Sequence, residues 1–523
     1  MTFILGTAAP GVHAEVNNAQ IARAAQLEGS DALFVAGYSI WGPANSAVNI
    51  TGLGEYTRRF GGFHPNSHLT DAIHLFFREG GTRAVVCRVV GAATAVATLT
   101  VNDRAGVPLA TLRVDAKYPS STVRVYVTIE AGDEANTVKI TARTPDLALP
   151  TEIFNNLKLT FTQPELDAIN NNLSKLITVQ KINELSNLIK LTNLASATAA
   201  PANLPALTAE TLLAGGSDDF AGLTDASFIG TDDGITRTGL QVFNTEEHGT
   251  GQVALPGITT TAAHLALAAH ASAFKRFAIA DLAPGADADD AITERRLLDS
   301  SYLALYWPPT IQAYDLTGSG VKKQYPVSGA VAGVFARAER EIGVHKAPAN
   351  YQLLSALDVE RASNGSPQTS EATRALLNRN EINVITPLSE EGVKVYGARV
   401  CASYGRVTAI HEQRVLNQAY YQLKKSYRSL VFGVLGGDRI FREARSVSEQ
   451  YLRLLFRSGA LFRTQEYPEG FVVICDANNN PREALDQHQL HVDVGLYIVG
   501  MAEMILLSIN NVPLSTSLDV LRG

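Results

Sequence analysis

The residues that could do chemistry in this 523-residue chain lie in short motifs, and none of these motifs is complete. A hydrolase built on an α/β scaffold needs a G-x-S-x-G nucleophile elbow, which does not occur. Ser328 follows Pro326-Val327 at the predicted start of a helix, so we expect an N-cap there rather than a nucleophile. Asp281 and Asp299 end apolar segments and are expected to form caps or turns. The sequence therefore predicts no catalytic residue.

Candidate metal and phosphate sites are incomplete as well. His411-Glu412 lacks the second histidine of an H-E-x-x-H zinc motif. Asp476–Asn480 resembles the start of an EF-hand loop, but Pro481 stands where the loop needs glycine and Gln487 where it needs a bidentate glutamate. We predict a turn at Asp476–Pro481, in which the Asp and Asn side chains bond to nearby backbone. Phosphate-binding glycine motifs are also missing, so no metal or cofactor is expected.

The clearest charged pattern is a set of five arginines on one predicted helix, Asp438–Phe462. At about 100° per residue this helix divides into two sides. The apolar side holds Ile440, Phe441, Ala444, Val447, Tyr451, Leu454 and Leu455. The other side holds Arg439, Arg442, Arg445, Arg453 and Arg457. Such a division predicts a helix that packs on a sheet through one face and offers positive charge through the other.

Charge is unevenly distributed along the chain. Lys394–Arg463 contains 13 Lys and Arg against 4 Asp and Glu, although the whole chain has a net charge of −7. The overall charge argues against a nucleic-acid-binding protein, and a basic band in an acidic chain predicts an acidic partner, which could be another copy of the chain. Cys87, Cys401 and Cys475 each lie in an apolar run, so we expect buried free thiols in a reducing compartment.

The elements around the arginine helix predict an α/β core that is completed late in the chain. A second helix is expected at His411–Tyr427, where apolar residues recur at helical spacing. Apolar runs rich in β-branched residues predict strands at Val395–Ala402, Ser429–Leu435, Phe471–Cys475, Leu490–Ile498 and Glu503–Ile509. Because charged residues and Gly500 interrupt the last two strands, they are not expected to form a membrane span.

Strands and helices also alternate earlier in the chain, which predicts a mixed or parallel sheet. Strands are expected at Asp31–Tyr38, Ala84–Val90, Arg276–Asp281 and Leu303–Trp307, and Glu381–Thr386 is expected to return the chain to the late core. Helices are expected at Leu53–Phe60, Leu69–Arg78, Thr259–Phe274, Ala291–Ser301 and Ser328–Arg340. Thr94–Arg143 contains alternating runs separated by turns, which predicts a small β-rich domain. Leu166–Leu194 is expected to contain helices, and Ala195–Pro205 is predicted to be a linker. Ala362–Thr373 is polar and predicted to be a loop.

Several longer motifs resemble those of the sheath proteins of contractile phage tails and phage-tail-like injection particles. The most specific stretch is Tyr325–Asn350, which is similar to the family pattern P-x-S-G-x-x-A-G-x-x-A-R followed by G-V-x-K-A-P-A-N. Pro10–Glu15 resembles P-G-V-Y-x-E, and Tyr396–Arg399 resembles W-G-A-R with Tyr in place of Trp. Cys475–Pro481, Val492–Gly495 and Ala502-Glu503 complete the likeness.

The resemblance implies a mixed α/β, multidomain fold. Its α/β core would come from the N- and C-terminal segments, with an inserted β-rich domain and a subtilisin-like α/β domain, the latter named for its fold and implying no protease triad. The expected division is an N-terminal donor-strand arm (1–20), the first part of the core (21–92), the β-rich insertion (93–205), the subtilisin-like domain (206–380), the C-terminal core (381–510) and a C-terminal arm (511–523).

The resemblance further implies a structural subunit that polymerises as stacked six-fold rings around an inner tube. On triggering, the sheath would contract and drive the tube through a cell envelope. Partners would be other copies of the chain, the inner tube protein, and baseplate and tail terminator proteins, in a virion tail or tail-like particle assembled in the bacterial cytoplasm. The arginine side would contact the tube, and the arms would lend strands to neighbouring subunits through Leu5, Val12, Val16, Val512, Leu514 and Leu518. The alternatives are an α/β hydrolase-like enzyme and another tail or baseplate component.

Overall fold

A computed structural model describes residues 29–171, 173–195, 201–360, 370–403, 405, 407–435 and 438–503. The predicted arms at 1–20 and 511–523, with Leu5, Val12, Val16, Val512, Leu514 and Leu518, lie outside the described residues. So does almost all of the strand predicted at Glu503–Ile509.

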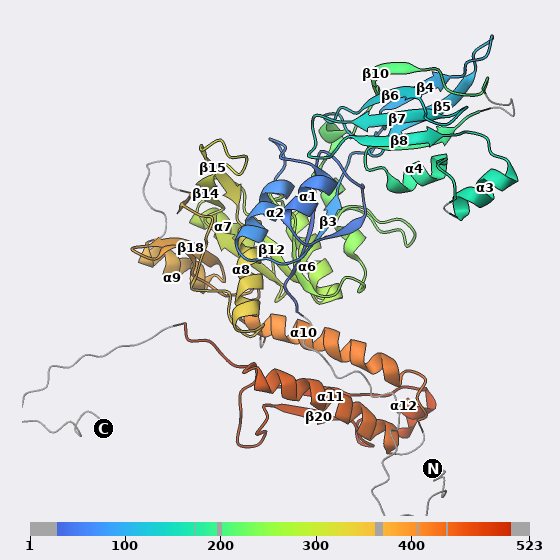
Figure 1. Cartoon of the computed structure of the whole chain (residues 1–523). Coiled ribbons are helices and arrows are strands. Elements are labelled where there is room, and N and C mark those ends of the chain that lie inside the picture. The colour runs from blue at the N-terminus through green and yellow to red at the C-terminus, as the bar shows by residue number, and fades with distance from the viewer. Residues whose placement is uncertain are drawn as a thin grey trace, which may run out of the picture.

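A nine-stranded sheet forms the centre of the molecule (Figure 1). Its order is β16-β19-β18-β13-β12-β11-β1-β3-β2. The six strands from β18 to β3 run parallel, whereas β2, β19 and β16 pair antiparallel at the two edges. The strands are Ala32–Gly37 (β1), Ala47–Ile50 (β2), Ala84–Arg88 (β3), Gly251–Ala254 (β11), Phe277–Ala280 (β12), Leu303–Trp307 (β13), Tyr351–Gln352 (β16), Asn383–Leu388 (β18) and Gly392–Val395 (β19).

Helices cover both faces of this sheet, which is why β1, β3 and β13 are buried at every position rather than at alternate ones. Leu33 and Val35 of β1 face one cluster, and Ala32 and Phe34 face the other. The first cluster contains residues of Leu53–Phe60 (α1), Leu69–Arg78 (α2) and Ser328–Glu341 (α8). The second contains residues of Thr261–Phe274 (α6), Ala288–Arg296 (α7) and Glu371–Arg379 (α9).

Two glycines explain much of the motif at Tyr325–Asn350. A Cβ added at Gly329 would lie 2.5 Å from Ala72 Cα, and one added at Gly333 would lie 2.6 Å from the Phe76 carbonyl oxygen. No real Cβ atom tolerates such distances, so only glycine lets α8 pack this closely on α2. The two glycines of the motif are therefore needed for the close contact between α8 and α2 in the core.

The β-rich insertion (residues 93–217) has its own core and two small sheets. Figure 1 shows it at the upper right, beyond the central sheet. One sheet has the order β10-β6-β7-β8 and the other β4-β5-β9. The elements are Thr98–Asn102 (β4), Ala110–Ala116 (β5), Tyr126–Ala131 (β6), Val138–Arg143 (β7), Glu152–Leu157 (β8), Gln163–Asn170 (α3), Val179–Leu185 (α4), Ile189–Asn193 (β9) and Thr208–Leu212 (β10). Fully buried Arg88 and Asp218, 3.6 Å apart, help to fix the insertion to the end of β3.

Short elements fill the remainder of the core. They are Phe220–Gly222 (η1), Asp225–Ile229 (α5), Gly239–Phe243 (η2), Thr310–Tyr314 (β14), Lys322–Pro326 (β15) and Asp358–Val359 (β17). Strands β15, β14 and β17 form a small antiparallel sheet that leads into α8.

The C-terminal unit (residues 410–503) lies below the core in Figure 1, at the other end of the molecule from the β-rich insertion. It contains Ile410–Tyr427 (α10), Arg428–Leu430 (η3), Arg439–Arg457 (α11), Phe471–Ile474 (β20), Arg482–Asp486 (α12) and Asp493–Leu496 (β21). Helices α10 and α11 share an apolar cluster with Phe471 of β20. Val344, from the loop after α8, belongs to the same cluster, so the core also contributes to this unit.

Most predicted elements are present, but several predictions were wrong. Ser429–Leu435 is not a strand: η3 is followed by a turn in which Phe432 has φ of 64°, and the run finds no strand partner in the described structure. Val395–Ala402 belongs to a strand only at Val395, where β19 ends, and later in the run Arg399 and Cys401 form isolated bridges. Helix α7 begins before the predicted Ala291 and ends at Arg296, and α9 begins at Glu371, inside the predicted loop Ala362–Thr373.

Strand order also differs from the expected core. Strands from 21–92 and from 381–510 do belong to one sheet, as expected, but β11, β12 and β13 of 206–380 lie between them. The predicted boundary at 380 therefore falls within the main sheet. The one at 205 falls within a sheet of the β-rich insertion, because β10 pairs with β6.

Candidate assembly surface

Helix α11 buries nearly the side that the sequence predicted. Its buried residues are Ile440, Phe441, Ala444, Ser448, Tyr451, Leu452 and Leu455. The predicted Val447 and Leu454 are half-buried at the border. This side packs on α10 and on the strand β20 rather than on a broad sheet.

The five arginines of α11 do not form a uniform charged surface. Arg439, Arg442, Arg453 and Arg457 are exposed and Arg445 is half-buried. Arg439 Nε lies 2.8 Å from Glu443, and Arg453 lies 3.1 Å from both Glu449 and Glu469. Within the described part of the chain, Arg442, Arg445 and Arg457 make no ion pair. Arg442 and Arg457 are therefore the exposed cations best placed to meet an acidic partner.

The two-stranded sheet of the C-terminal unit has open edges. Val472 pairs with Gly495 and Ile474 with Asp493 in an antiparallel ladder. Among described strands, β20 pairs only with β21, so each strand has one edge without a strand partner. Unpaired backbone N–H and C=O groups at such edges can accept a strand from another chain.

The turn predicted at Asp476–Pro481 is confirmed, and it holds this hairpin. Asn479 Nδ2 donates to the Ile474 carbonyl and to Asp493, both at 2.9 Å. Asn480 Oδ1 accepts the His491 N–H at 2.6 Å, and its amide donates back to the His491 carbonyl at 2.9 Å. The side chains thus bond to backbone across the hairpin instead of converging on an ion.

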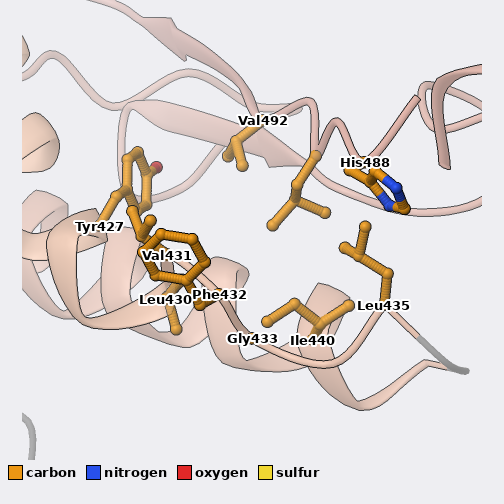
Figure 2. Close-up of a pocket in the computed structure, with 10 residues that line it drawn as sticks. Tyr427, Leu430, Val431, Phe432, Gly433, Leu435, Ile440, His488 and Val492 are labelled. Atoms are coloured by element: carbon orange, nitrogen blue, oxygen red, sulfur yellow. The ribbon is translucent and has the colours of Figure 1, made fainter.

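An apolar pocket of about 570 Å³ lies beside the hairpin (Figure 2). It is lined by Tyr427, Leu430, Val431, Phe432, Gly433, Leu435, Ile440, His488, Leu490 and Val492. A second pocket of about 640 Å³ shares Tyr427, Val431 and Val492 and continues along α10 to Leu496 of β21. Phe432 is fully exposed, as are most atoms of Val434. The sequence does not predict this surface, because the apolar run Ser429–Leu435 has the composition of a strand.

The candidate catalytic residues have structural partners. Ser328 is the first residue of α8 rather than its N-cap, so that prediction was wrong. Instead Asp281, fully buried at the end of β12, accepts from the Ser328 N–H (2.8 Å), the Ser328 hydroxyl (2.6 Å) and the Gly257 N–H (3.1 Å). The carboxylate therefore caps α8 from a neighbouring strand, which agrees with the capping role predicted for it.

The three cysteines are buried and free, as expected. Burial raises the pKa of the Cys87 and Cys401 thiols to about 12, so both stay protonated and unreactive near neutral pH. Across the described ranges, no cluster of three or more His, Cys, Asp or Glu side chains is arranged to hold a metal. In those ranges no helix is long and apolar enough to cross a bilayer.

Comparison with known families locates the family signature in the centre of the fold. Residues 244–401 match the model of the phage tail sheath protein central domain. Over these residues the chain is similar to the central domain of tail sheath proteins. This segment supplies α8 and six strands of the main sheet, from β16 at the edge through β19, β18, β13 and β12 to β11. The resemblance inferred from Tyr325–Asn350 and Tyr396–Arg399 is thereby confirmed.

Individual sheath proteins are similar over different lengths. The tail sheath protein of Salmonella phage ViI is 26% identical over 226 residues, which are 40% of this chain and 32% of that protein. The alignment thus spans about a third of the length of that relative. Among solved structures, the helical sheath of the anti-feeding prophage in its contracted state is 19% identical, with a TM-score of 0.54 over 96% of this chain and 99% of that one. The sheath tail protein of Listeria innocua is 14% identical, with a TM-score of 0.59 over 87% and 91%. The chain therefore has the mixed α/β, multidomain fold of sheath proteins.

Proposed function

We propose that this chain is the structural subunit of a contractile sheath, which polymerises as stacked six-fold rings around an inner tube and contracts to drive the tube through a cell envelope. The observation that carries the proposal is the sheath central domain at 244–401 within a fold that matches sheath structures nearly end to end. The particle would be a phage tail or a phage-tail-like injection machine, assembled in the bacterial cytoplasm.

The open edges of the two-stranded sheet support polymerisation by strand exchange. The arms at 1–20 and 511–523 would pair with β20 and β21 of neighbouring copies, with Leu5, Val12, Val16, Val512, Leu514 and Leu518 facing apolar surface. The pockets beside β21 offer such surface. Each cross-strand pair stabilises by roughly 0.2–1 kcal/mol, so one strand contributes a few kcal/mol and a continuous mesh contributes much more.

The charged side of α11 supports attachment to an acidic inner tube. Exposed ion pairs contribute about 0.2–1 kcal/mol each, which is too weak to hold one subunit but sufficient when repeated along a tail. Weak contacts also suit a sheath, because contraction must release every subunit from the tube. Arg442 and Arg457 would contribute most, with Arg439, Arg445 and Arg453 adding to the local positive field. Baseplate and terminator proteins would complete the assembly at its two ends.

Electron microscopy of the purified full-length protein tests this proposal. A sheath subunit should form long hollow tubes of stacked rings at high protein concentration. An α/β hydrolase-like enzyme, the alternative with a catalytic function, would stay as discrete particles. Another tail or baseplate component would form single rings or small complexes. Discrete particles or isolated rings under all conditions would overturn the sheath assignment.

A further inference from the structure

One buried carboxylate joins the N-terminal end of the described fold to the C-terminal unit. Glu339 lies in the last turn of α8, and its side chain is 9% exposed. Its Oε1 accepts the Ser30 N–H at 2.6 Å, and its Oε2 accepts the Ser30 hydroxyl at 2.7 Å. Oε2 also accepts from the guanidinium of Arg414, in α10, at 2.6 Å. Ser30 and Arg414 are themselves buried, so the three groups meet away from solvent.

Ser30 is held at each of its polar atoms. Besides the two bonds to Glu339, its carbonyl accepts from Gln252 Nε2 of β11 at 3.0 Å. Two residues later the chain enters β1 of the central sheet. Residues 1–28 therefore join the described fold at a point that is clamped to α8 and β11, and Arg414 ties the same carboxylate to α10.

Arg414 depends strongly on this arrangement. Burial lowers the pKa of its guanidinium, and the nearby Glu339 carboxylate opposes that shift. The guanidinium carbon also lies 5.0 Å from the centre of the Phe335 ring on α8. In the described structure Arg414 makes its one ion pair with Glu339. Removing the carboxylate would leave a buried cation without its counter-charge, which is far more costly than losing a surface pair.

We propose that Glu339 is a coupling residue, which transmits a pull on the N-terminal segment to the C-terminal unit. Under the proposed function, on which the mechanical part rests, the N-terminal arm of each subunit is held by a neighbour. Tension in that arm reaches Ser30, passes through one carboxylate to Arg414, and so acts on α10. A buried polar contact made of charge-assisted hydrogen bonds suits this role because its geometry is more restricted than that of a sliding apolar contact.

Hydrogen–deuterium exchange on the full-length monomer tests the coupling without any assembly. Glu339→Gln keeps the shape of the side chain but loses its charge. We expect exchange to rise roughly tenfold both in the peptide 29–38 and in the first turns of α10, since hydrogen bonds to charged groups are the strongest of those lost. The β-rich insertion should not change. Glu341→Gln, on the same helix at an exposed position, is the matched control and should change neither peptide.

A mutant cycle separates coupling from a merely structural role. Arg414→Met should raise exchange in 29–38 when Glu339 is present, and should add nothing in the Glu339→Gln background. Ser30→Ala removes only the hydroxyl, and it should raise exchange in α10 even if Glu339→Gln fails to fold. The proposal would be overturned if the substitutions at 339 and 414 had independent, additive effects on exchange. It would also be overturned if Arg414→Met left exchange in peptide 29–38 unchanged.

The mechanical consequence has its own measurement. Tubes polymerised from Glu339→Gln should break into shorter pieces in electron micrographs, after a shear treatment that leaves wild-type and Glu341→Gln tubes intact. Equal length distributions would refute force transmission through Glu339. If the wild type forms no tubes, the sheath function fails, whereas the exchange experiment still decides whether Glu339 couples the two regions.

Discussion

Arg399 and Glu503, 104 residues apart in the chain, form an ion pair between the core and the end of the described C-terminal unit. Both residues belong to motifs that resemble sheath proteins, Tyr396–Arg399 and Ala502-Glu503. The backbone of Arg399 is fixed by Asn383 of β18, which accepts its N–H at 2.6 Å and donates to its carbonyl at 2.8 Å. The chain that leaves at residue 503 is thus tied to an edge region of the main sheet.

Breaking this pair should loosen the segment locally. Both side chains are about one-third exposed, so the pair should be worth about 0.2–1 kcal/mol. Glu503→Gln is therefore expected to raise hydrogen exchange in 497–503 by roughly 1.5- to 5-fold, with β18 unchanged. Glu483→Gln, at an exposed site in α12, serves as the control. Equal exchange in the wild type, Glu503→Gln and Glu483→Gln would mean that the ion pair does not hold residues 497–503 in place.

Reversing the unpaired arginines of α11 should block attachment to a tube. Arg442→Glu with Arg457→Glu should leave the fold intact, because both side chains are exposed and α11 packs through its other side. The variant should form empty tubes but should not assemble around inner tube, and high salt should weaken wild-type attachment likewise. Arg296→Glu with Arg379→Glu, two exposed arginines of α7 and α9, makes the same charge change as a control. Normal sheathing of tubes by the first variant would show that these arginines do not face the tube.

Replacing the N-terminal arm should prevent polymerisation without unfolding the protein. If Met1–Val16 becomes a Gly/Ser segment of equal length, Leu5, Val12 and Val16 are lost and no apolar strand remains to pair with a neighbour. Circular dichroism should be unchanged, because under the donor-strand proposal these residues pair with a neighbouring subunit and not with their own core. Tubes should be absent from micrographs. Regular tubes of the replaced protein would contradict the donor-strand proposal.

Replacing all three cysteines should cost stability but spare assembly. Cys87, Cys401 and Cys475 are fully buried in apolar surroundings, so each change to Ala should destabilise by about 1 kcal/mol. The urea midpoint should fall, while tube formation in reducing buffer should be unaffected. A folded triple variant that assembles but cannot contract would reveal a redox role that the structure does not explain.

The buried His270 and the half-buried His74 should make the core sensitive to acid. Burial lowers the pKa of His270 to about 3 and that of His74 to about 4, against 6.5 in the unfolded chain. His270 Nε2 accepts from Arg276 at 2.8 Å, a bond that its protonation would abolish. The unfolded state therefore binds more protons below pH 6.5, and each histidine contributes a stability loss of about 1.4 kcal/mol per pH unit as pH falls from 6.5 towards its folded pKa. Urea midpoints between pH 7 and 4.5 should fall less steeply for His74→Gln than for the wild type, and His491→Gln, a surface change, should not alter the slope.

The local spacing of apolar residues and turn residues in the sequence predicts much of this fold. The bounds of α1, α2 and β13 agree with the predicted residues, because their apolar spacing and flanking turns are contained within each segment. Ser429–Leu435 has the composition of a strand, but a strand forms only where a partner lies alongside, and no described strand reaches this run. Local pattern does not predict strand order either, since β1 pairs with β11 across the whole β-rich insertion.

The candidate surface was predictable only in part. The apolar side of α11 follows from helical periodicity, and the pair of Arg453 with Glu449 could have been inferred from their spacing of four residues. Glu469, the other partner of Arg453, lies in the loop before β20, so helical periodicity could not predict this second ion pair. Glu339 likewise resembled one more charged residue near a helix end, because Ser30 and Arg414 are distant in sequence.

The place of β1 in the sheet has a consequence for synthesis. Its two neighbours are β3 and β11, and the complete β-rich insertion is translated between them. While the insertion emerges from the ribosome, one edge of β1 has no partner, and every side chain of that strand is apolar or glycine. The nascent chain therefore exposes a strand edge suited to aggregation until β11 is made. Under the proposed function many copies are needed per particle, so correct folding during translation would depend on whatever covers that edge.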